Sequence, residues 1–175
     1  SWSRGLGDVY KRQHPTTYTA GVSFNQKEIL DKKIKIIQSN RGGKITLHNP
    51  GQKIIYFVIN LNKRKKDIRK FINVIEKSVI QFLETYKIIA KKDKKNIGIW
   101  VHQKKIAAIG IRVSRWVAYH GCSINISNNL NQYLKIIPCG LDNRKVTSIF
   151  KEKKIKPKNY ENKLAEIFIK NIYQI

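Results

Sequence analysis

The chain has 175 residues, of which 41% are hydrophobic, which suits one domain with a buried core and excludes a largely disordered chain. Its 36 Lys and Arg residues outnumber 11 Asp and Glu, a formal net charge of +25, so we expect acidic partners such as nucleic acid, an anionic membrane or an acidic protein. Two cysteines exclude a disulfide scaffold and a four-cysteine zinc site, and the lack of an apolar stretch of about 20 residues excludes a membrane-spanning helix.

The first half of the chain is expected to hold strands followed by one long helix. Residues 1–13 are polar and lack periodicity, and we interpret them as a foreign or scar segment outside the domain. Strand and loop patterns begin at residue 14, with a short strand at 45–48 and a buried strand at 53–61 that is rich in β-branched residues. Apolar residues at helical spacing predict a helix from Asp67, its N-cap, to Lys87.

The second half combines further strands with shorter helices. We expect a solvated turn at 91–95, strands at 96–101, 105–113 and 116–126, a short helix at 128–134, a mobile segment at 151–158 and an amphipathic helix at 160–173. Antiparallel strands with hairpin-like links and a few separate helices predict one α+β domain over residues 14–175.

Cys139 is a candidate nucleophile. It lies between Pro138 and Gly140, where proline fixes the approach of the chain and glycine leaves room for a substrate. A free thiol has a pKa of about 8.5, so a base or a nearby cation must generate the thiolate. His48, His120 and many lysines could serve, and the residues alone do not choose among them. A small buried hydrophobe is an equally good reading of Cys139.

The other polar motifs are less specific. Residues 41–44, Arg-Gly-Gly-Lys, lack P-loop spacing and the Gly-Lys-Ser/Thr ending, so they form a turn or let a ligand approach the backbone rather than bind a nucleoside triphosphate. The four histidines lack metal-ligand spacing, so no metal site is expected. The basic runs at 63–66, 91–95 and 151–158 are typical of solvated faces.

Four segments, in this order, resemble the lipoyl(octanoyl) transferase family. They are Tyr18-Thr19-Ala20-Gly21 with His14-Pro15 upstream; residues 41–52, RGGKITLHNPGQ, similar to the family's R-G-G-x-x-T-x-H-G-P-G-Q; Lys105–Arg112 followed by His120-Gly121 and Asn125; and Pro138-Cys139-Gly140-Leu141 with Val146-Thr147-Ser148. The resemblance covers residues 14–150. Asn49 replaces a glycine, Cys122 replaces a larger apolar residue and is not expected to react, and the family's N-terminal strand and helix have no counterpart, so we expect a domain truncated at its N-terminus.

The resemblance implies a fold and a reaction. The fold would be that of the biotin/lipoate protein ligase catalytic domain, a mixed β-sheet with flanking helices. The reaction would transfer an octanoyl or lipoyl group from acyl carrier protein to a lysine of lipoyl domains, in 2-oxoacid dehydrogenase complexes and the glycine cleavage H protein, as the first step of endogenous protein lipoylation. The thioester already carries the activation, so no cofactor is expected. We expect a cytoplasmic location, because no presequence is visible.

The same resemblance assigns the site residues. Cys139 would carry the acyl group as a thioester, and Lys105 would complete a catalytic cysteine/lysine dyad by lowering the pKa of the thiol and later accepting a proton. Substrate contacts are expected from three segments: Arg41, Gly42, Gly43, Lys44, Ile45, Thr46, Leu47 and His48; Ala108, Ile109 and Gly110; and Gly121, Cys122 and Ser123. Apolar faces near 54–59 and 107–111 would line the acyl slot.

Three alternatives stay open. An ATP-dependent lipoate-protein ligase has the same fold but needs no cysteine, and its signature of a serine and three glycines is not matched by Arg41-Gly42-Gly43. A basic nucleic-acid-binding module would bind with strong salt dependence and tolerate Cys139→Ala. An inactive relative is the third, against which the presence of Cys139, Lys105 and His48 argues.

Overall fold

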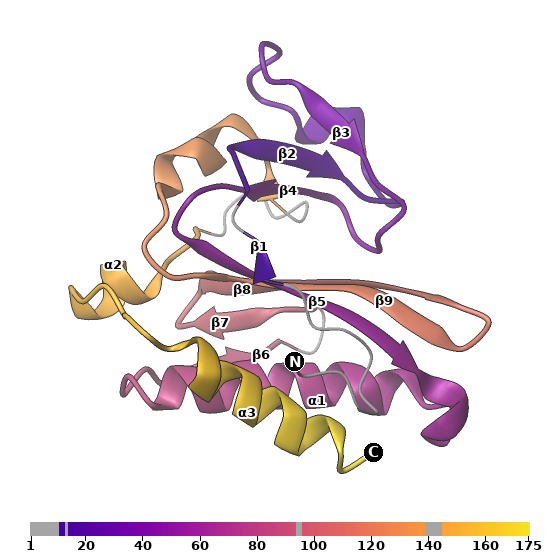
Figure 1. The fold of residues 1–175 in the computed structure, drawn as a ribbon. Helices are drawn as coiled ribbons and strands as arrows, with labels where there is room; N and C mark the ends of the chain where they lie inside the picture. The colour runs from indigo at the N-terminus through magenta and orange to yellow at the C-terminus, as the bar shows by residue number, and fades with distance from the viewer. Residues whose placement is uncertain (1–10, 13, 94–95, 139–144) are drawn as a thin grey trace.

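The computed structural model describes residues 11–12, 14–93, 96–138 and 145–175, which form two sheets and a layer of helices (Figure 1). In chain order the elements are β1 (Lys11–Arg12), β2 (Thr17–Ala20), η1 (Gln26–Glu28), β3 (Ile36–Gln38), β4 (Ile45–His48), β5 (Gln52–Asn60), η2 (Leu61–Lys63), α1 (Ile68–Glu84), β6 (Lys91–Lys92), β7 (Ile99–Val101), β8 (Lys104–Ser114), β9 (Val117–Asn125), η3 (Leu130–Lys135), α2 (Ile149–Lys153) and α3 (Glu161–Ile172). The η elements are single turns or short runs of 3₁₀ helix.

The larger sheet has six strands in the order β1-β5-β9-β8-β7-β6, and its described pairs are antiparallel. Its centre is the β8–β9 hairpin, in which Ser114 pairs with Val117 across a two-residue turn. Arg115 and Trp116 occupy that turn with φ of 48° and 62°, which matches the right-handed twist of the flanking strands. The hairpin brings two of the predicted substrate-binding segments side by side, since Gly110 pairs with Gly121.

The smaller sheet has the order β3-β2-β4, with β2 parallel to β3 and antiparallel to β4. It lies over one face of the larger sheet, and α1 and α3 cover the other face (Figure 1). The α+β class predicted from the sequence is confirmed by this arrangement, and the expected mixed pairing is found in this smaller sheet.

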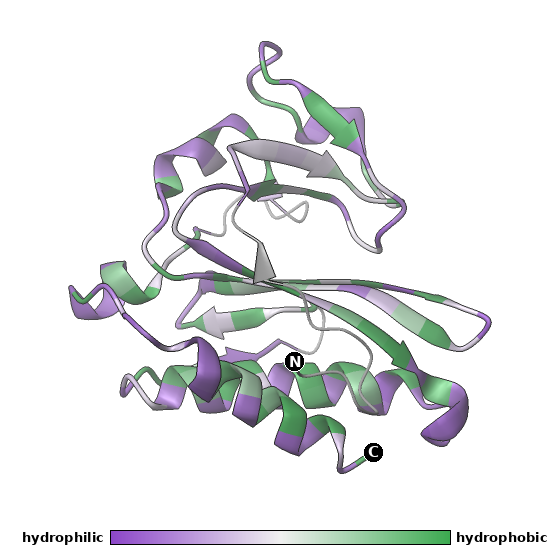
Figure 2. Ribbon diagram, in the orientation of Figure 1, coloured by the Kyte–Doolittle hydropathy of each residue, from purple (hydrophilic) through white to green (hydrophobic). Residues whose placement is uncertain are grey.

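The helices pack on the larger sheet through apolar faces. Asp67 caps α1 as predicted, because its carboxylate accepts a hydrogen bond from the Lys70 amide at 2.8 Å. Hydrophobic and hydrophilic bands alternate along α1 and α3 in Figure 2, and the aromatic rings of Phe57, Phe71 and Phe168 join strand to helices with centroid separations of 5.5 to 6.1 Å. This main core is separate from a smaller core that the second sheet forms with Tyr133 of η3 and with Ile136.

Several elements differ from the sequence-based expectations. Lys91–Lys92, predicted as a turn, pairs with β7 as an edge strand. Residues 128–134, predicted as a helix, correspond to the 3₁₀ helix at Leu130–Lys135. The predicted mobile segment 151–158 begins inside α2, where the Ser148 hydroxyl caps the helix. None of the described helices has the length and apolar character needed to cross a bilayer.

Candidate active site

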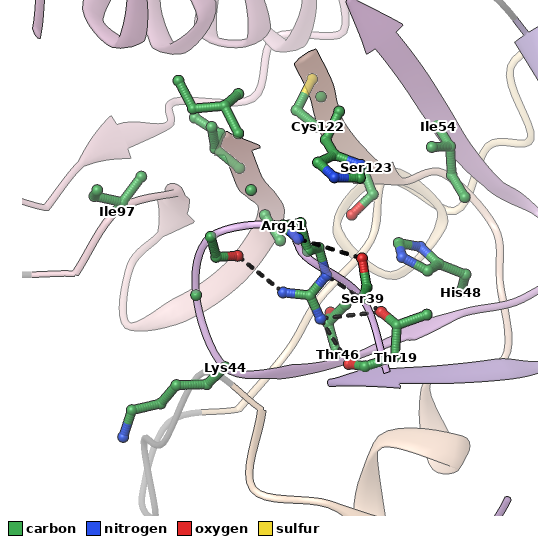
Figure 3. A pocket seen from close by; sticks show the side chains of 18 of the residues that line it. Thr19, Ser39, Arg41, Lys44, Thr46, His48, Ile54, Ile97, Cys122 and Ser123 are labelled. Carbon is green, nitrogen blue, oxygen red and sulfur yellow. Dashed lines mark hydrogen bonds between the residues drawn. The ribbon is translucent and has the colours of Figure 1, made fainter. Parts of the chain in front are cut away.

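A cavity of about 970 Å³ lies where the two sheets face each other, and it collects most of the residues predicted to bind substrate (Figure 3). Its lining includes the following predicted residues: Arg41, Gly42, Gly43, Lys44, Ile45, Thr46, His48, Lys105, Ala108, Ile109, Gly110, Gly121, Cys122 and Ser123. Leu47 is the exception, because it is fully buried in the smaller core, where it supports the cavity wall from behind. Strand alternation explains this placement, since Thr46 and His48 point to the opposite side of β4.

The turn at Arg41–Gly43 is fixed by its own arginine. The Arg41 guanidinium donates to the Thr19 carbonyl oxygen at 2.6 Å, to the Thr19 hydroxyl at 3.0 Å and to the Gly42 carbonyl oxygen at 3.0 Å (Figure 3). The Gly42 amide donates to the Ile111 carbonyl oxygen of β8 at 3.2 Å, and a Cβ atom on Gly42 would lie 2.7 Å from that oxygen. The arginine and the glycine therefore join the smaller sheet to the larger one at the cavity.

Lys44 and Ile45 are positioned by a buried carboxylate. Glu28 accepts a hydrogen bond from the Ile45 amide at 3.1 Å and pairs with the Lys44 ammonium at 3.1 Å. The Glu28 side chain is only 5% exposed, whereas that of Lys44 is 41% exposed. The pair fixes the start of β4 and leaves the Lys44 stem along the cavity wall.

Lys105 is more deeply buried than Lys44, the other lysine that lines the cavity, and only 7% of its surface is exposed. Its ammonium nitrogen donates to the Ile97 carbonyl oxygen at 3.0 Å and lies 5.3 Å from the centre of the Trp100 ring. Gly98 lies between these two partners with a φ of 139°, and a Cβ atom there would be 3.0 Å from the ammonium nitrogen. The Lys105 ammonium is therefore held by the Ile97 carbonyl and the face of the Trp100 ring, in space that is free because residue 98 is a glycine.

The backbone of Lys105 holds the chain that follows the segment bearing Cys139. The Lys105 amide donates to the Lys145 carbonyl oxygen, and the Thr147 amide donates to the Lys105 carbonyl oxygen, both at 2.9 Å. Pro138 and Val146 line a small cavity together with Lys105. Cys139 itself lies outside the described residues, so the predicted dyad stays a prediction.

Three histidines, His14, His48 and His120, line the cavity together with Tyr56. His48 Nδ1 lies 3.0 Å from Gln52 Oε1, and His14 Nε2 lies 2.8 Å from the Tyr56 hydroxyl. The two imidazole rings are 5.9 Å apart. Burial lowers the pKa of His48 to about 4, outweighing the hydrogen bond to the Gln52 side-chain oxygen that raises it, so the ring is neutral near pH 7.

His120 and Cys122 lie on β9 with different surroundings. His120 Nε2 is 2.6 Å from the Asn40 side-chain oxygen, and burial, followed by the Arg41 and Arg112 charges, lowers its pKa. Cys122 is buried, and burial raises the pKa of its thiol well above the usual range. This agrees with the expectation that Cys122 does not react.

Sequence reasoning gave no site role to several cavity residues. Thr19 and Ile97 line the cavity, and Gly98 packs against Lys105. Thr19 lies inside a segment that carried the family resemblance, whereas Ile97 and Gly98 had no sequence signal of their own. Tyr56 lies in the 54–59 segment from which the acyl slot was expected. Among the described residues, no group of three or more His, Cys, Asp or Glu side chains is arranged to hold a metal ion.

Comparison with known proteins identifies the family of the chain. Residues 9–169 match the model of the lipoyl protein ligase A/B catalytic domain. Relatives named octanoyltransferase include those of Wolbachia pipientis wMel, 42% identical over 95% of this chain and 82% of the relative, and of Rickettsia canadensis, 46% identical over 81% and 71%. The chain spans 63% of the Bartonella tribocorum octanoyltransferase, to which it is 41% identical over 80% of its own length.

Solved structures show the same fold at low sequence identity. A lipoate-protein ligase A bound with ATP has a TM-score of 0.75 at 13% identity, covering 94% of this chain and 72% of the other. A biotin protein ligase from Aquifex aeolicus in complex with biotin and ATP has a TM-score of 0.60 at 14% identity, covering 89% and 70%. The predicted likeness to the biotin/lipoate ligase fold is confirmed, and the chain belongs to the lipoyl protein ligase A/B catalytic domain family, within which its relatives at 40–46% identity are octanoyltransferases.

Proposed function

We propose that this chain is an acyltransferase that moves an octanoyl group from acyl carrier protein to a lysine of a lipoyl domain through a thioester on Cys139. The observation that carries the proposal is the buried ammonium of Lys105, which lines the cavity and shares a smaller one with Pro138 and Val146. Pro138 precedes Cys139 in the chain, and the Lys145–Thr147 segment that follows is hydrogen-bonded to Lys105.

In the first half-reaction the Cys139 thiolate attacks the carbonyl carbon of the octanoyl thioester. A new C–S bond forms, the C–S bond to the carrier breaks, and the carrier thiol leaves with the proton that Cys139 gave up. A nearby ammonium favours the thiolate form, which is the role we assign to Lys105. The transfer is split into two easier steps by this covalent intermediate.

In the second half-reaction the uncharged amine of the acceptor lysine attacks the Cys139 thioester. The C–N bond of the amide forms, the C–S bond breaks, and one proton passes from the amine to the departing sulfur. Lys105, uncharged once it has passed the Cys139 proton to the carrier thiol in the first step, accepts this proton from the amine and passes it to the Cys139 sulfur. Lys105 lines the cavity in which the acceptor amine would meet the thioester, and this supports that role.

The apolar part of the cavity suits an unbranched acyl chain. Ile54, Ala108, Ile109 and Ile111 line it, in agreement with the two strand segments from which the slot was expected. Burial of a methylene group is worth about 0.8 kcal/mol, so discrimination between chain lengths is a matter of how many methylenes the slot covers.

The proposed partners are an acyl carrier protein as donor and, as acceptors, the lipoyl domains of 2-oxoacid dehydrogenase complexes and the glycine cleavage H protein. The formal net charge of +25 supports acidic partners, because complementary charge accelerates encounter. We propose that the enzyme works in the cytoplasm, and because the donor thioester is already activated, the reaction as proposed consumes no ATP.

The test is intact-protein mass spectrometry after mixing with octanoyl carrier protein, for the wild type, Cys139→Ser and Lys105→Ala. We expect an octanoyl adduct on the wild type that apo lipoyl domain discharges without ATP, a much slower adduct on Cys139→Ser, and slow formation on Lys105→Ala. Acylation that requires ATP and free acid would instead identify a ligase. A folded wild type that forms no adduct would contradict the proposal.

A further inference from the structure

A chain of buried amide groups runs from the segment after Cys139 to the cavity. Asn125 Nδ2 donates to the Thr147 carbonyl oxygen at 2.9 Å. A backbone carbonyl only accepts hydrogen bonds, so this contact fixes which end of the Asn125 amide faces Thr147. The Asn125 oxygen therefore faces the other way, where Gln52 Nε2 donates to it at 2.8 Å and also to the Tyr133 hydroxyl at 3.0 Å.

The orientation of Gln52 then sets the tautomer of His48. With both Nε2 hydrogen bonds of Gln52 directed to Asn125 and Tyr133, its Oε1 atom is left facing His48 Nδ1 at 3.0 Å. An amide oxygen has no proton to give, so His48 Nδ1 carries the hydrogen of this contact. Because burial keeps the pKa of His48 at about 4, the ring holds a single proton near pH 7, and Nε2 keeps its lone pair.

The lone pair of Nε2 is available to a ligand. His48 lines the cavity, and Figure 3 shows its imidazole among the side chains of the cavity wall. Within the described part of the chain His48 is hydrogen-bonded through Nδ1 and not through Nε2, and Nε2 is not sealed from solvent. His48 follows Thr46 by two positions on the same face of β4, and Thr46 lines a small cavity together with Lys105.

The reacting groups differ in what they can offer to such an acceptor. A thioester presents a carbonyl oxygen and a sulfur, which both accept, and an octanoyl chain has no polar hydrogen. The amide N–H groups of the carrier arm are separated from the reacting atoms by several bonds. The amine of the acceptor lysine is the reactant that brings N–H groups to the reaction centre.

We propose that His48 Nε2 accepts a hydrogen bond from the ε-amino group of the acceptor lysine as this amine attacks the Cys139 thioester, with Gln52 and Asn125 as positioning residues that hold the His48 tautomer. The inference rests on the proposed acyl transfer. The hydrogen bond orients the amine so that its lone pair points to the carbonyl carbon. The bond that forms is C–N and the bond that breaks is C–S; the amine proton passes to the Cys139 sulfur by way of Lys105, and His48 neither gains nor loses a proton.

The tautomer can be measured without activity. In the wild type labelled with ¹⁵N-histidine, two-bond ¹H–¹⁵N spectra at pH 7 should show His48 protonated at Nδ1 and unprotonated at Nε2. The His48 signals are those missing from His48→Asn, and the exposed His102 provides a reference ring in the same spectrum. A His48 ring protonated at Nε2 would overturn the inference, whatever the enzyme proves to catalyse.

Two substitutions at position 48 then distinguish the effect of the Nε2 lone pair from the effect of the hydrogen bond between His48 and Gln52. The amide nitrogen of His48→Asn can replace Nδ1 as donor to Gln52 but offers nothing in place of Nε2, whereas the longer side chain of His48→Gln can place an amide oxygen near the Nε2 position. We expect His48→Asn to slow transfer from octanoyl-Cys139 to apo lipoyl domain about tenfold more than it slows formation of the thioester, and His48→Gln to recover part of this loss. His102→Asn is the control and should leave both rates unchanged.

Rapid mixing with mass detection resolves the two half-reactions, so the two proposals fail in different ways. Equal slowing of both steps by His48→Asn, or slowing of thioester formation alone, would overturn the role assigned to His48 while leaving the octanoyltransferase intact. If only thioester formation were slowed, the His48 Nε2 lone pair would instead accept a hydrogen bond from the arm of the carrier protein. A wild type that forms no thioester would contradict the proposed function, and the tautomer measurement would still decide the structural half of the inference.

Discussion

Gly98 lies so close to Lys105 that a Cβ atom at position 98 would stand 3.0 Å from the lysine ammonium nitrogen. The same ammonium donates to the carbonyl oxygen of Ile97, the residue before Gly98. The position of the proposed catalytic lysine is therefore set by a loop that precedes its own strand, and the space it occupies exists because residue 98 has no side chain.

Gly98→Ala should displace the Lys105 ammonium. Its methyl group would compete with the lysine for space, and alanine at a φ of 139° adds strain of about 1–3 kcal/mol. If Lys105 lowers the pKa of Cys139, the rate of thiol alkylation by iodoacetamide should rise at a higher pH in this variant, as in Lys105→Ala. Urea unfolding of the same sample reports the strain separately. An alkylation profile identical to that of the wild type in a folded Gly98→Ala protein would contradict the prediction.

Arg41→Lys should destabilise the protein although it keeps the charge. Lysine cannot reproduce the fork that joins the Thr19 carbonyl and hydroxyl to the Gly42 carbonyl, so we expect a loss of about 2 kcal/mol in the free energy of unfolding. Arg112→Lys is the matched control, because Arg112 makes one exposed hydrogen bond to the Asn40 carbonyl oxygen. Equal losses in the two variants, measured by urea denaturation, would show that the fork is not what holds the turn.

Acid should weaken the fold through His48. The pKa of His48 is about 4 in the folded chain and about 6.5 when unfolded, so the unfolded chain binds more protons between these values. The free energy of unfolding should therefore fall as the pH drops from about 6.5 towards about 4, by up to about 3 kcal/mol from this residue.

His120, whose pKa is also lowered, adds a smaller effect of the same sign. Asp31 and Glu152, whose pKa values are lowered too, lose their contributions only at more acidic pH. Urea titrations of the wild type and His48→Gln across this range test the assignment, since the variant should have a shallower slope. A slope unchanged by His48→Gln would place the acid sensitivity elsewhere.

Ala108→Leu should shorten the preferred acyl chain. Ala108 lines the cavity from β8, and the added carbons would occupy space that the proposal gives to the octanoyl chain. Two methylenes are worth about 1.6 kcal/mol, so kcat/KM for octanoyl relative to hexanoyl donors should fall about tenfold. A ratio that stays constant would show that the acyl chain runs along another wall of the cavity.

The rate of encounter with the donor protein should depend on salt. The formal net charge of +25 predicts that kcat/KM with octanoyl carrier protein decreases steadily as ionic strength rises. Octanoyl-pantetheine, which is small and uncharged, is the control and should show little change. A flat salt dependence with the carrier protein would exclude electrostatic steering.

The sequence predicted the elements whose signals are local. The helix from Asp67 and the hairpin around Arg115 have strong periodicity, a cap or a short link, and both were found within a few residues of their predicted ends. In the smaller sheet β4 was predicted at its observed residues, 45–48, because turn signals bound it on both sides. β2 and β3 were not predicted as strands, because four and three residues are too few to show a period and the parallel partner of β2 lies across a long loop.

For the candidate site, too, the sequence indicated what local motifs record and missed what depends on long-range packing. Motif resemblance selected residues most of which the structure places around one cavity, because motifs record which residues occur together and not how they contact each other. Two placements depended on three-dimensional packing that no pattern reports: Leu47 turned into the smaller core, and Gly98 with Trp100 surrounded Lys105. The roles of Arg41 and Gly42 in joining the sheets likewise appear only once β2 and β8 are seen on either side of them.

The contact between Gly42 and Ile111 has a consequence for the solubility of the molecule. β7 pairs with β8 only as far as Ala107, so along residues 108–114 the described strands leave one side of β8 without a partner strand. A long strand with such an open side can template pairing with another copy of the chain. The Gly42 amide donates a hydrogen bond to the Ile111 carbonyl oxygen on this side, and the Arg41–Gly43 turn blocks the approach of another strand. A change that loosened this turn would therefore be expected to promote aggregation as well as to disturb the site.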